Sequence, residues 1–267
     1  MDLKSAAIIE NLKSAPLLAG DLPLVPTFDR SLFGDVQRGA GLNFDQKLGH
    51  LYEQALGGLI NSSPSLSCLA SHLQVFSDTR RTLGEMDFIL RDHTSNQHIH
   101  LELAVKFYLA RKSPDGWQFP GPNANDNWQR KLDHMLQRQL TLSQAPEAQT
   151  LLYERFNIKE IKVQQLIYGC LFIPLECHDI PRPQFMSPSR QEGRWLYARQ
   201  WSENLSSIKE ALLIPKPLWP VEISSETRVL FEKASVETLI EQGNERCTMF
   251  ALKDTDQKMF LVPDTWD

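Results

Sequence analysis

The sequence predicts an α/β fold in which a mixed central β-sheet is flanked by helices. An amphipathic helical pattern at residues 45–60 is followed by two apolar, strand-like segments at 84–91 and 98–108. A second helical pattern at 126–142 is followed by another apolar strand at 161–174. Helices that alternate with strands in this order favour a sheet covered by helices on both faces.

The composition is that of a soluble globular protein. The chain has 267 residues, 42% of them hydrophobic, and 28 Lys and Arg against 33 Asp and Glu give a net charge of −5. A chain of this length buries roughly 70–75% of its unfolded surface, so it needs neither disulfides nor a structural metal to fold. The acidity excludes nucleic-acid binding through bulk positive charge, but it leaves room for a local basic groove.

The cysteines and the N-terminus indicate a cytoplasmic protein with no membrane association. The four cysteines form no Cys-x-x-Cys pair, so we expect free thiols in a reducing compartment: Cys68, Cys170, Cys177 and Cys247. The first 20 residues carry four charges, which excludes a signal peptide or anchor. Their apolar residues predict a short helix that ends before Pro16.

We expect three regions along the chain. Residues 1–44 combine the N-terminal helix with an extended, Pro- and Gly-containing segment that wraps over a core. Residues 45–175 form the α/β core, and residues 190–267 form a C-terminal extension after a proline-rich boundary. Smaller expectations are a strand at 73–77, a loop at 113–125, a helix at 226–242 and a terminal hairpin at 247–264.

The two strands at 84–91 and 98–108 form a hairpin that concentrates charge on one face. If Arg91 faces His98, Asp87 lies directly opposite Glu102. Facing carboxylates repel each other unless a cation or a proton lies between them, and carboxylates are ligands for Mg²⁺. The alternative is a solvent-facing strand edge with mixed charges, although the apolar flanking residues favour a deeper position.

Other residues on this face are also candidate catalytic or metal-binding residues, because alternate side chains of a strand point to the same face. In the same register Glu85 lies opposite Ala104, and Lys106 shares the face of Glu102. His98 and His100 also alternate there. A His-x-His pair can bind transition metals, but we expect these two to end the strand near the turn.

The segments GEMD (84–87) and ELAVK (102–106) resemble the core motifs of the PD-(D/E)xK phosphodiesterase superfamily. Gly49 and Glu53 resemble the helix that supplies a further acidic residue in many of its members. More closely, LGEMDFIL, HLELAVKFYL and GPN followed by a Lys-Leu helix resemble an uncharacterised bacterial family with a domain-of-unknown-function label, placed in that superfamily.

The resemblance implies a restriction-endonuclease-like core and a Mg²⁺- or Mn²⁺-dependent nuclease that hydrolyses DNA or RNA. It assigns metal binding to Asp87, the motif lysine to Lys106 and the helix acid to Glu53. The chain departs from the motif at Ala104, where an acidic residue is usual, so Glu102 or Glu85 would take its place. The expected catalytic residues are therefore Lys106, Asp87 and Glu102, and the expected metal ligands are Asp87, Glu102, Glu53 and Glu85.

A basic and aromatic segment between residues 104 and 140 favours contact with nucleic acid. On the predicted helix at 126–142, three of its basic residues recur every four positions. The candidate contacts are Arg111, Lys112, Arg130, Lys131, His134 and Arg138. A merely solvated helix face is the alternative for this helix.

Two other functions remain open from the sequence. The Ala104 departure and the net negative charge favour a catalytically weakened nuclease fold that binds nucleic acid or a protein partner without cleavage. A third possibility is an unrelated α/β protein that acts on a small phosphorylated molecule in a closed pocket.

Overall fold

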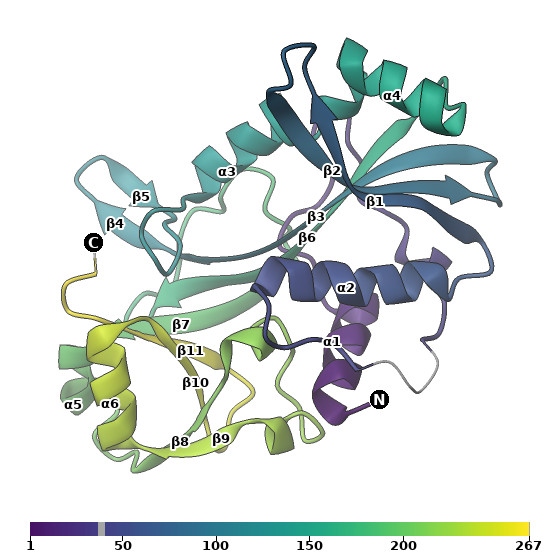
Figure 1. Cartoon of the computed structure of the whole chain (residues 1–267). Helices are drawn as coiled ribbons and strands as arrows, with labels where there is room; N and C mark the ends of the chain where they lie inside the picture. The colour runs from purple at the N-terminus through teal and green to yellow at the C-terminus, as the bar shows by residue number, and fades with distance from the viewer. Residues whose placement is uncertain (37–40, 267) are drawn as a thin grey trace. The chain divides into compact units, whose positions relative to one another are not determined.

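The computed structural model describes residues 1–36 and 41–266 and confirms the predicted fold class (Figure 1). Within that part of the chain, six α-helices flank a large mixed sheet whose strands follow the order β1-β2-β3-β6-β7-β11-β10-β8-β9, and β4 and β5 pair separately. None of the helices described is long and apolar enough to cross a membrane. The helices are α1 (Leu3–Ser14), α2 (Leu48–Asn61), α3 (Trp128–His134), α4 (Pro146–Phe156), α5 (Trp201–Asn204) and α6 (Val236–Glu245).

The strands comprise two groups in the sequence, separated by α3 and α4. The first group is β1 (Leu66–Phe76), β2 (Thr82–Asp92), β3 (Gln97–Leu109), β4 (Arg111–Ser113) and β5 (Gly116–Gln118). The second group is β6 (Lys162–Pro174), β7 (Gln191–Tyr197), β8 (Glu210–Leu213), β9 (Glu232–Ser235), β10 (Thr248–Leu252) and β11 (Lys258–Val262).

The chain forms two compact units, each built from segments that are distant in the sequence. The first unit contains Met1, Ala19–Ala104 and Arg130–Ile167. The second unit contains Asp2–Leu18, Val105–Gln129 and Tyr168–Asp267. Residues of β3 and of β6 therefore belong to both units.

In the first unit, β1, β2 and β3 are antiparallel neighbours, and both α2 and α4 contact β1. Arg91 faces His98, so the predicted hairpin register is confirmed. An apolar cluster joins β1 and β2 to α4 and its flanking turns: Leu73, Val75, Met86, Ile89, Leu142, Ala148, Leu152 and Ile158. This core holds in place the stretch of β2 that carries Asp87.

Three elements of the first unit differ from the sequence prediction. Strand β1 is longer than the predicted 73–77. The predicted helix at 126–142 divides into α3, a π-helical turn at Met135–Gln139 and a 3-10 turn at Leu142–Gln144. Helix α4 was not predicted because only Ala148 and Leu152 are buried, which gives a weak apolar stripe.

In the second unit, β11 pairs in parallel with β7 and antiparallel with β10, which confirms the predicted terminal hairpin. Helix α6 packs over this part of the sheet. The predicted helix at 226–242 is wrong at its start, because residues 232–235 pair with β8 as strand β9. Ser235 then caps α6 by accepting a hydrogen bond from the Thr238 backbone N–H.

Gly169 shows how tightly β6 approaches β3 in the second unit. Its φ of 142° is unfavourable for other residues, and an added Cβ would overlap the Lys106 carbonyl oxygen. We expect Gly169→Ala to lower the free energy of unfolding by about 2 kcal/mol. Urea unfolding of the full chain measures the effect, and Gly20→Ala is the control because no atom lies within 4 Å of its added Cβ. Equal urea midpoints for the two variants would refute this explanation.

Candidate functional site

Asp87 on β2 and Glu102 on β3 face each other, and each carboxylate accepts a hydrogen bond from a backbone N–H of the other strand. Regular pairing between the strands ends at Phe88 and Leu101, so Asp87 and Glu102 are the next facing residues. The Asp87 backbone N–H donates to Glu102 Oε1 at 3.3 Å, and the Leu103 N–H donates to Asp87 Oδ2 at 2.8 Å. Side chains thus replace main-chain hydrogen bonds here and fix both carboxyl groups.

Glu102 is fully buried in a polar network. His100 Nε2 lies 2.8 Å from Glu102 Oε1, and the Gln139 amide donates to Oε2 at 2.9 Å. His100 is also fully buried, and its Nδ1 lies 3.1 Å from the Ser143 hydroxyl oxygen. Both oxygens of Glu102 therefore already have partners, as buried polar atoms require.

Asp87 lies beside this network, and its pKa is raised well above the usual range of an aspartate. Burial is the main cause that raises its pKa, to about 8, and the negative charges of Glu102 and Glu53 raise it further. The Leu103 N–H and the positive charge of Lys131 act in the opposite direction on this pKa. A divalent cation bound at this carboxyl would displace the proton, because positive charge stabilises the ionised form.

Lys106 and Lys131 lie in different units and have different hydrogen-bond partners. Lys106 lies in the second unit, where its Nζ donates to Asp126 at 2.8 Å. Lys131 lies in the first unit, and its Nζ donates at 2.6 Å to Gln139, whose amide binds Glu102. Lys131, predicted as a nucleic-acid contact, therefore also belongs to the hydrogen-bonded surroundings of the acidic pair.

Glu53 and Glu85, the other predicted metal ligands, lie with two histidines that the sequence analysis missed. His50 Nδ1 lies 2.9 Å from Glu53 Oε2, and His72 Nδ1 lies 3.7 Å from that oxygen and 3.2 Å from Glu85 Oε1. His50 is one helical turn before Glu53, a spacing that could have marked it. His72 carries no such signal, because its position depends on how β1 pairs with β2.

His72 occupies an unusual position in β1. Ser71 pairs with Phe88 and Leu73 pairs with Met86, so His72 is the residue that faces Asp87. Its φ of 51° is left-handed, which is uncommon for a residue with a side chain inside a strand. His72 on β1, Asp87 on β2 and Glu102 on β3 are therefore neighbours in one row across the three strands.

The other predicted nucleic-acid contacts fall into two groups. Arg130, His134 and Arg138 are exposed, but Arg138 lies in the π-helical turn, where four residues no longer make one helical turn. The structure therefore does not keep the regular line predicted for a single helix. Arg111 and Lys112 lie on β4 in the second unit.

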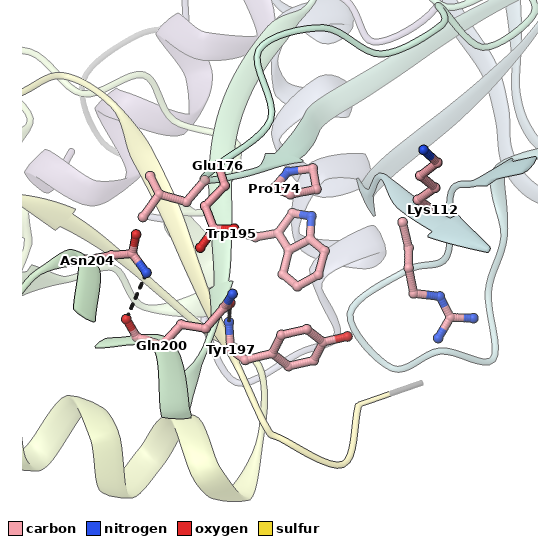
Figure 2. A pocket seen from close by; sticks show the side chains of 9 residues that line it. Lys112, Pro174, Glu176, Trp195, Tyr197, Gln200 and Asn204 are labelled. Carbon is pink, nitrogen blue, oxygen red and sulfur yellow. Dashed lines mark hydrogen bonds between the residues drawn. The ribbon is translucent and has the colours of Figure 1, made fainter. Parts of the chain in front are cut away.

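Arg111 and Lys112 line a pocket of about 210 Å³ in the second unit. The other lining residues are Pro174, Leu175, Glu176, Trp195, Tyr197, Gln200 and Asn204. Figure 2 shows Lys112 on one side of the aromatic rings and Gln200 and Asn204 on the other. The pocket places the two basic side chains near Trp195 and Tyr197, which lie outside the basic and aromatic segment of the prediction, and Glu176 adds a negative charge to its lining.

Comparison with known proteins gives a family but no activity. No curated protein and no solved structure matches the chain. The superfamily resemblance of the sequence motifs is untested by these comparisons and stays a prediction. The family model described as "Domain of unknown function (DUF1853)" matches residues 24–256. Since this match covers most of the sequence, the chain belongs to the DUF1853 family.

Proposed function

We propose that the chain is a metal-dependent phosphodiesterase that cleaves DNA or RNA, with Asp87 at its centre. The observation that supports this most is the crowding of acidic groups at Asp87. The carboxylates of Glu102 and Glu53 raise the pKa of Asp87, and Glu102 faces Asp87 from the neighbouring strand. Such crowding favours the binding of a cation, and strongly perturbed pKa values concentrate at functional sites.

The donor chemistry fits a hard divalent cation such as Mg²⁺ or Mn²⁺. Asp87, Glu53 and Glu85 offer carboxylate oxygens, and Mg²⁺ commonly uses only one or two protein carboxylates. When bound, the cation supplies a water molecule of lowered pKa and neutralises charge on the scissile phosphate. Glu102, whose oxygens already accept hydrogen bonds, would orient Asp87 through its backbone N–H.

Two lysines provide candidates for the positive charge that would hold a phosphate oxygen. The sequence motif assigns this role to Lys106, and the structure adds Lys131, whose charge acts on Asp87. Arg130, His134 and Arg138 are exposed and belong to the first unit, as Asp87 does. These three side chains would contact the backbone of the nucleic acid.

The second candidate function is binding of nucleic acid without cleavage. One observation favours it: Glu102 has no exposed surface and both of its oxygens already have partners. With Ala104 at the usual acidic position of the motif, the chain would then lack one metal ligand. This function predicts binding of nucleic acid that no divalent cation converts into cutting.

The test is cleavage of single- and double-stranded DNA and RNA in the presence of Mn²⁺. We expect Asp87→Asn to lower the cleavage rate at least 100-fold, because it removes a charged ligand. The cleavage rates of Lys106→Ala and Lys131→Ala, compared with each other, separate the roles of the two lysines. Asp115→Asn and Lys159→Ala, two exposed positions, are the controls.

The outcomes separate the two functions. Cleavage that is lost in Asp87→Asn and kept in both controls supports the phosphodiesterase. Binding without cleavage supports the weakened module. Equal cutting by the wild type and Asp87→Asn would overturn the proposal, because the activity would then arise elsewhere or from a contaminant.

A further inference from the structure

A cluster of two histidines and one glutamate lies in the first unit, outside the Asp87–Glu102 pair. Its members are His50, Glu53 and His72, and one ligand atom from each lies within 4.8 Å of the others. Glu85 adds a fourth side chain, because its Oε1 lies 3.2 Å from His72 Nδ1. We propose that these residues bind one Zn²⁺ ion, with Glu85 as the fourth ligand.

The distances between the donor atoms fit tetrahedral zinc. Bonds of about 2.0–2.1 Å in a tetrahedron place neighbouring ligand atoms about 3.3 Å apart. The separations are 2.9 Å for His50 and Glu53, 3.7 Å for His72 and Glu53, and 3.2 Å for His72 and Glu85. They lie on both sides of the ideal value. Only His50, Glu53 and His72 have donor atoms that all lie within 4.8 Å of one another, so the Glu85 side chain has to rotate towards the other three to complete the tetrahedron.

The ligand types favour zinc or a transition metal over Mg²⁺. Imidazole nitrogens suit zinc, whereas Mg²⁺ prefers oxygen ligands alone. Two neutral histidines and two carboxylates together carry a charge of −2, which balances Zn²⁺. Zinc binding thus gives a reason for the two histidines beside the acids, which a purely magnesium-binding site would not need.

The backbone supports the inference independently of the side chains. Ligands come from three elements, with His50 and Glu53 on α2, His72 on β1 and Glu85 on β2, and α2 contacts β1. His72 has a left-handed backbone, a strained conformation that accumulates at ligand sites. Hydrogen bonds between exposed histidines and carboxylates are weak and do not account for this strain.

Access for the ion is open. The side chains of His50 and His72 are 57% and 45% exposed, while Glu53 is only 14% exposed and anchors the cluster. An ion can therefore enter from solvent and meet a carboxylate that is already held in place. Glu53 and Glu85 also belong to the ligands proposed for Mg²⁺, which would leave Asp87 as the carboxylate that Mg²⁺ alone uses. Zinc binding does not rest on cleavage and would stand if the chain cut nothing.

The experiment is titration of the full chain with Co²⁺, followed by visible absorption, and then displacement by Zn²⁺. Tetrahedral cobalt absorbs far more strongly than the hydrated ion, so we expect a band that zinc removes in a one-to-one ratio. His50→Ala and His72→Ala, both at exposed positions, should each weaken binding at least 10-fold. His178→Ala, an exposed histidine of the second unit, is the matched control and should bind as the wild type does.

The absence of the cobalt band, or a band of equal affinity in His50→Ala and His72→Ala, would overturn the zinc proposal. Asp87→Asn keeps all four ligands and should still bind cobalt. Cobalt binding without any cleavage would refute the phosphodiesterase and leave the zinc site standing. Cleavage with Mg²⁺ but no cobalt band would refute only the zinc site.

Discussion

Replacing Asp87 with asparagine should stabilise the protein at pH 8 in the absence of divalent cations. The pKa of Asp87 is raised from 3.8 to about 8 by burial and by neighbouring carboxylates. The folded state therefore binds this proton between about pH 4 and pH 8, whereas the unfolded chain releases it. Stability from this group is fully present below about pH 4 and is lost as pH rises towards 8.

The expected size of this effect is large. Each unit of pKa corresponds to about 1.4 kcal/mol, which gives an upper limit of about 6 kcal/mol, and solvent at the partly buried side chain reduces it to about 2–3 kcal/mol. The substituted amide is neutral at every pH and can still accept the hydrogen bond from the Leu103 N–H, so Asp87→Asn should remove this loss. Lys258, whose pKa burial lowers to about 8, acts with the opposite sign and only above that pH.

The measurement is the urea midpoint of the wild type and Asp87→Asn between pH 4 and pH 8, with Asp115→Asn as the control. The difference between the two proteins should grow with pH and shrink when Mn²⁺ is added, because the cation stabilises the ionised carboxylate of the wild type alone. A difference that stays constant with pH would show that Asp87 is ionised in the folded protein throughout.

Removal of Glu102 should strongly destabilise the first unit. Glu102→Ala would leave His100, the Gln139 amide and the Asp87 N–H without their buried acceptor. Breaking such a buried network from one side costs about 3–5 kcal/mol. Glu102→Gln, which keeps the shape and one carbonyl oxygen, should cost clearly less.

A double-mutant cycle with His100→Ala tests the cause. If the cost of Glu102→Ala comes from partners left unsatisfied, the double variant should be more stable than the sum of the two single losses predicts. Urea unfolding of the full chain measures all four proteins. Simple additivity would show that Glu102 and His100 do not act as one network.

The hairpin register was predictable because its determinants are local. Turn-forming residues between two apolar strands, and side chains that alternate between faces, place Arg91 against His98 and therefore Asp87 against Glu102. Helix α2 was predictable for the same reason, since its buried residues recur at helical spacing.

What the sequence did not predict depends on contacts between distant residues. His72 meets Glu53 and Glu85 only because β1 pairs with β2 in one register and because its own backbone is left-handed. Gln139 reaches Glu102 from a π-helical turn, whereas the residue pattern indicates a continuous α-helix.

The position of β11 has a consequence for how the protein is made. This strand is the last in the chain, yet it lies between β7 and β10 in the sheet. A ribosome that adds about 5–20 residues per second needs roughly 3–13 s to extend the chain from the end of β7 to the end of β11. During that interval the nascent β7 edge has no β11 to pair with, so we expect the second unit to be the part of the newborn chain that chaperones protect.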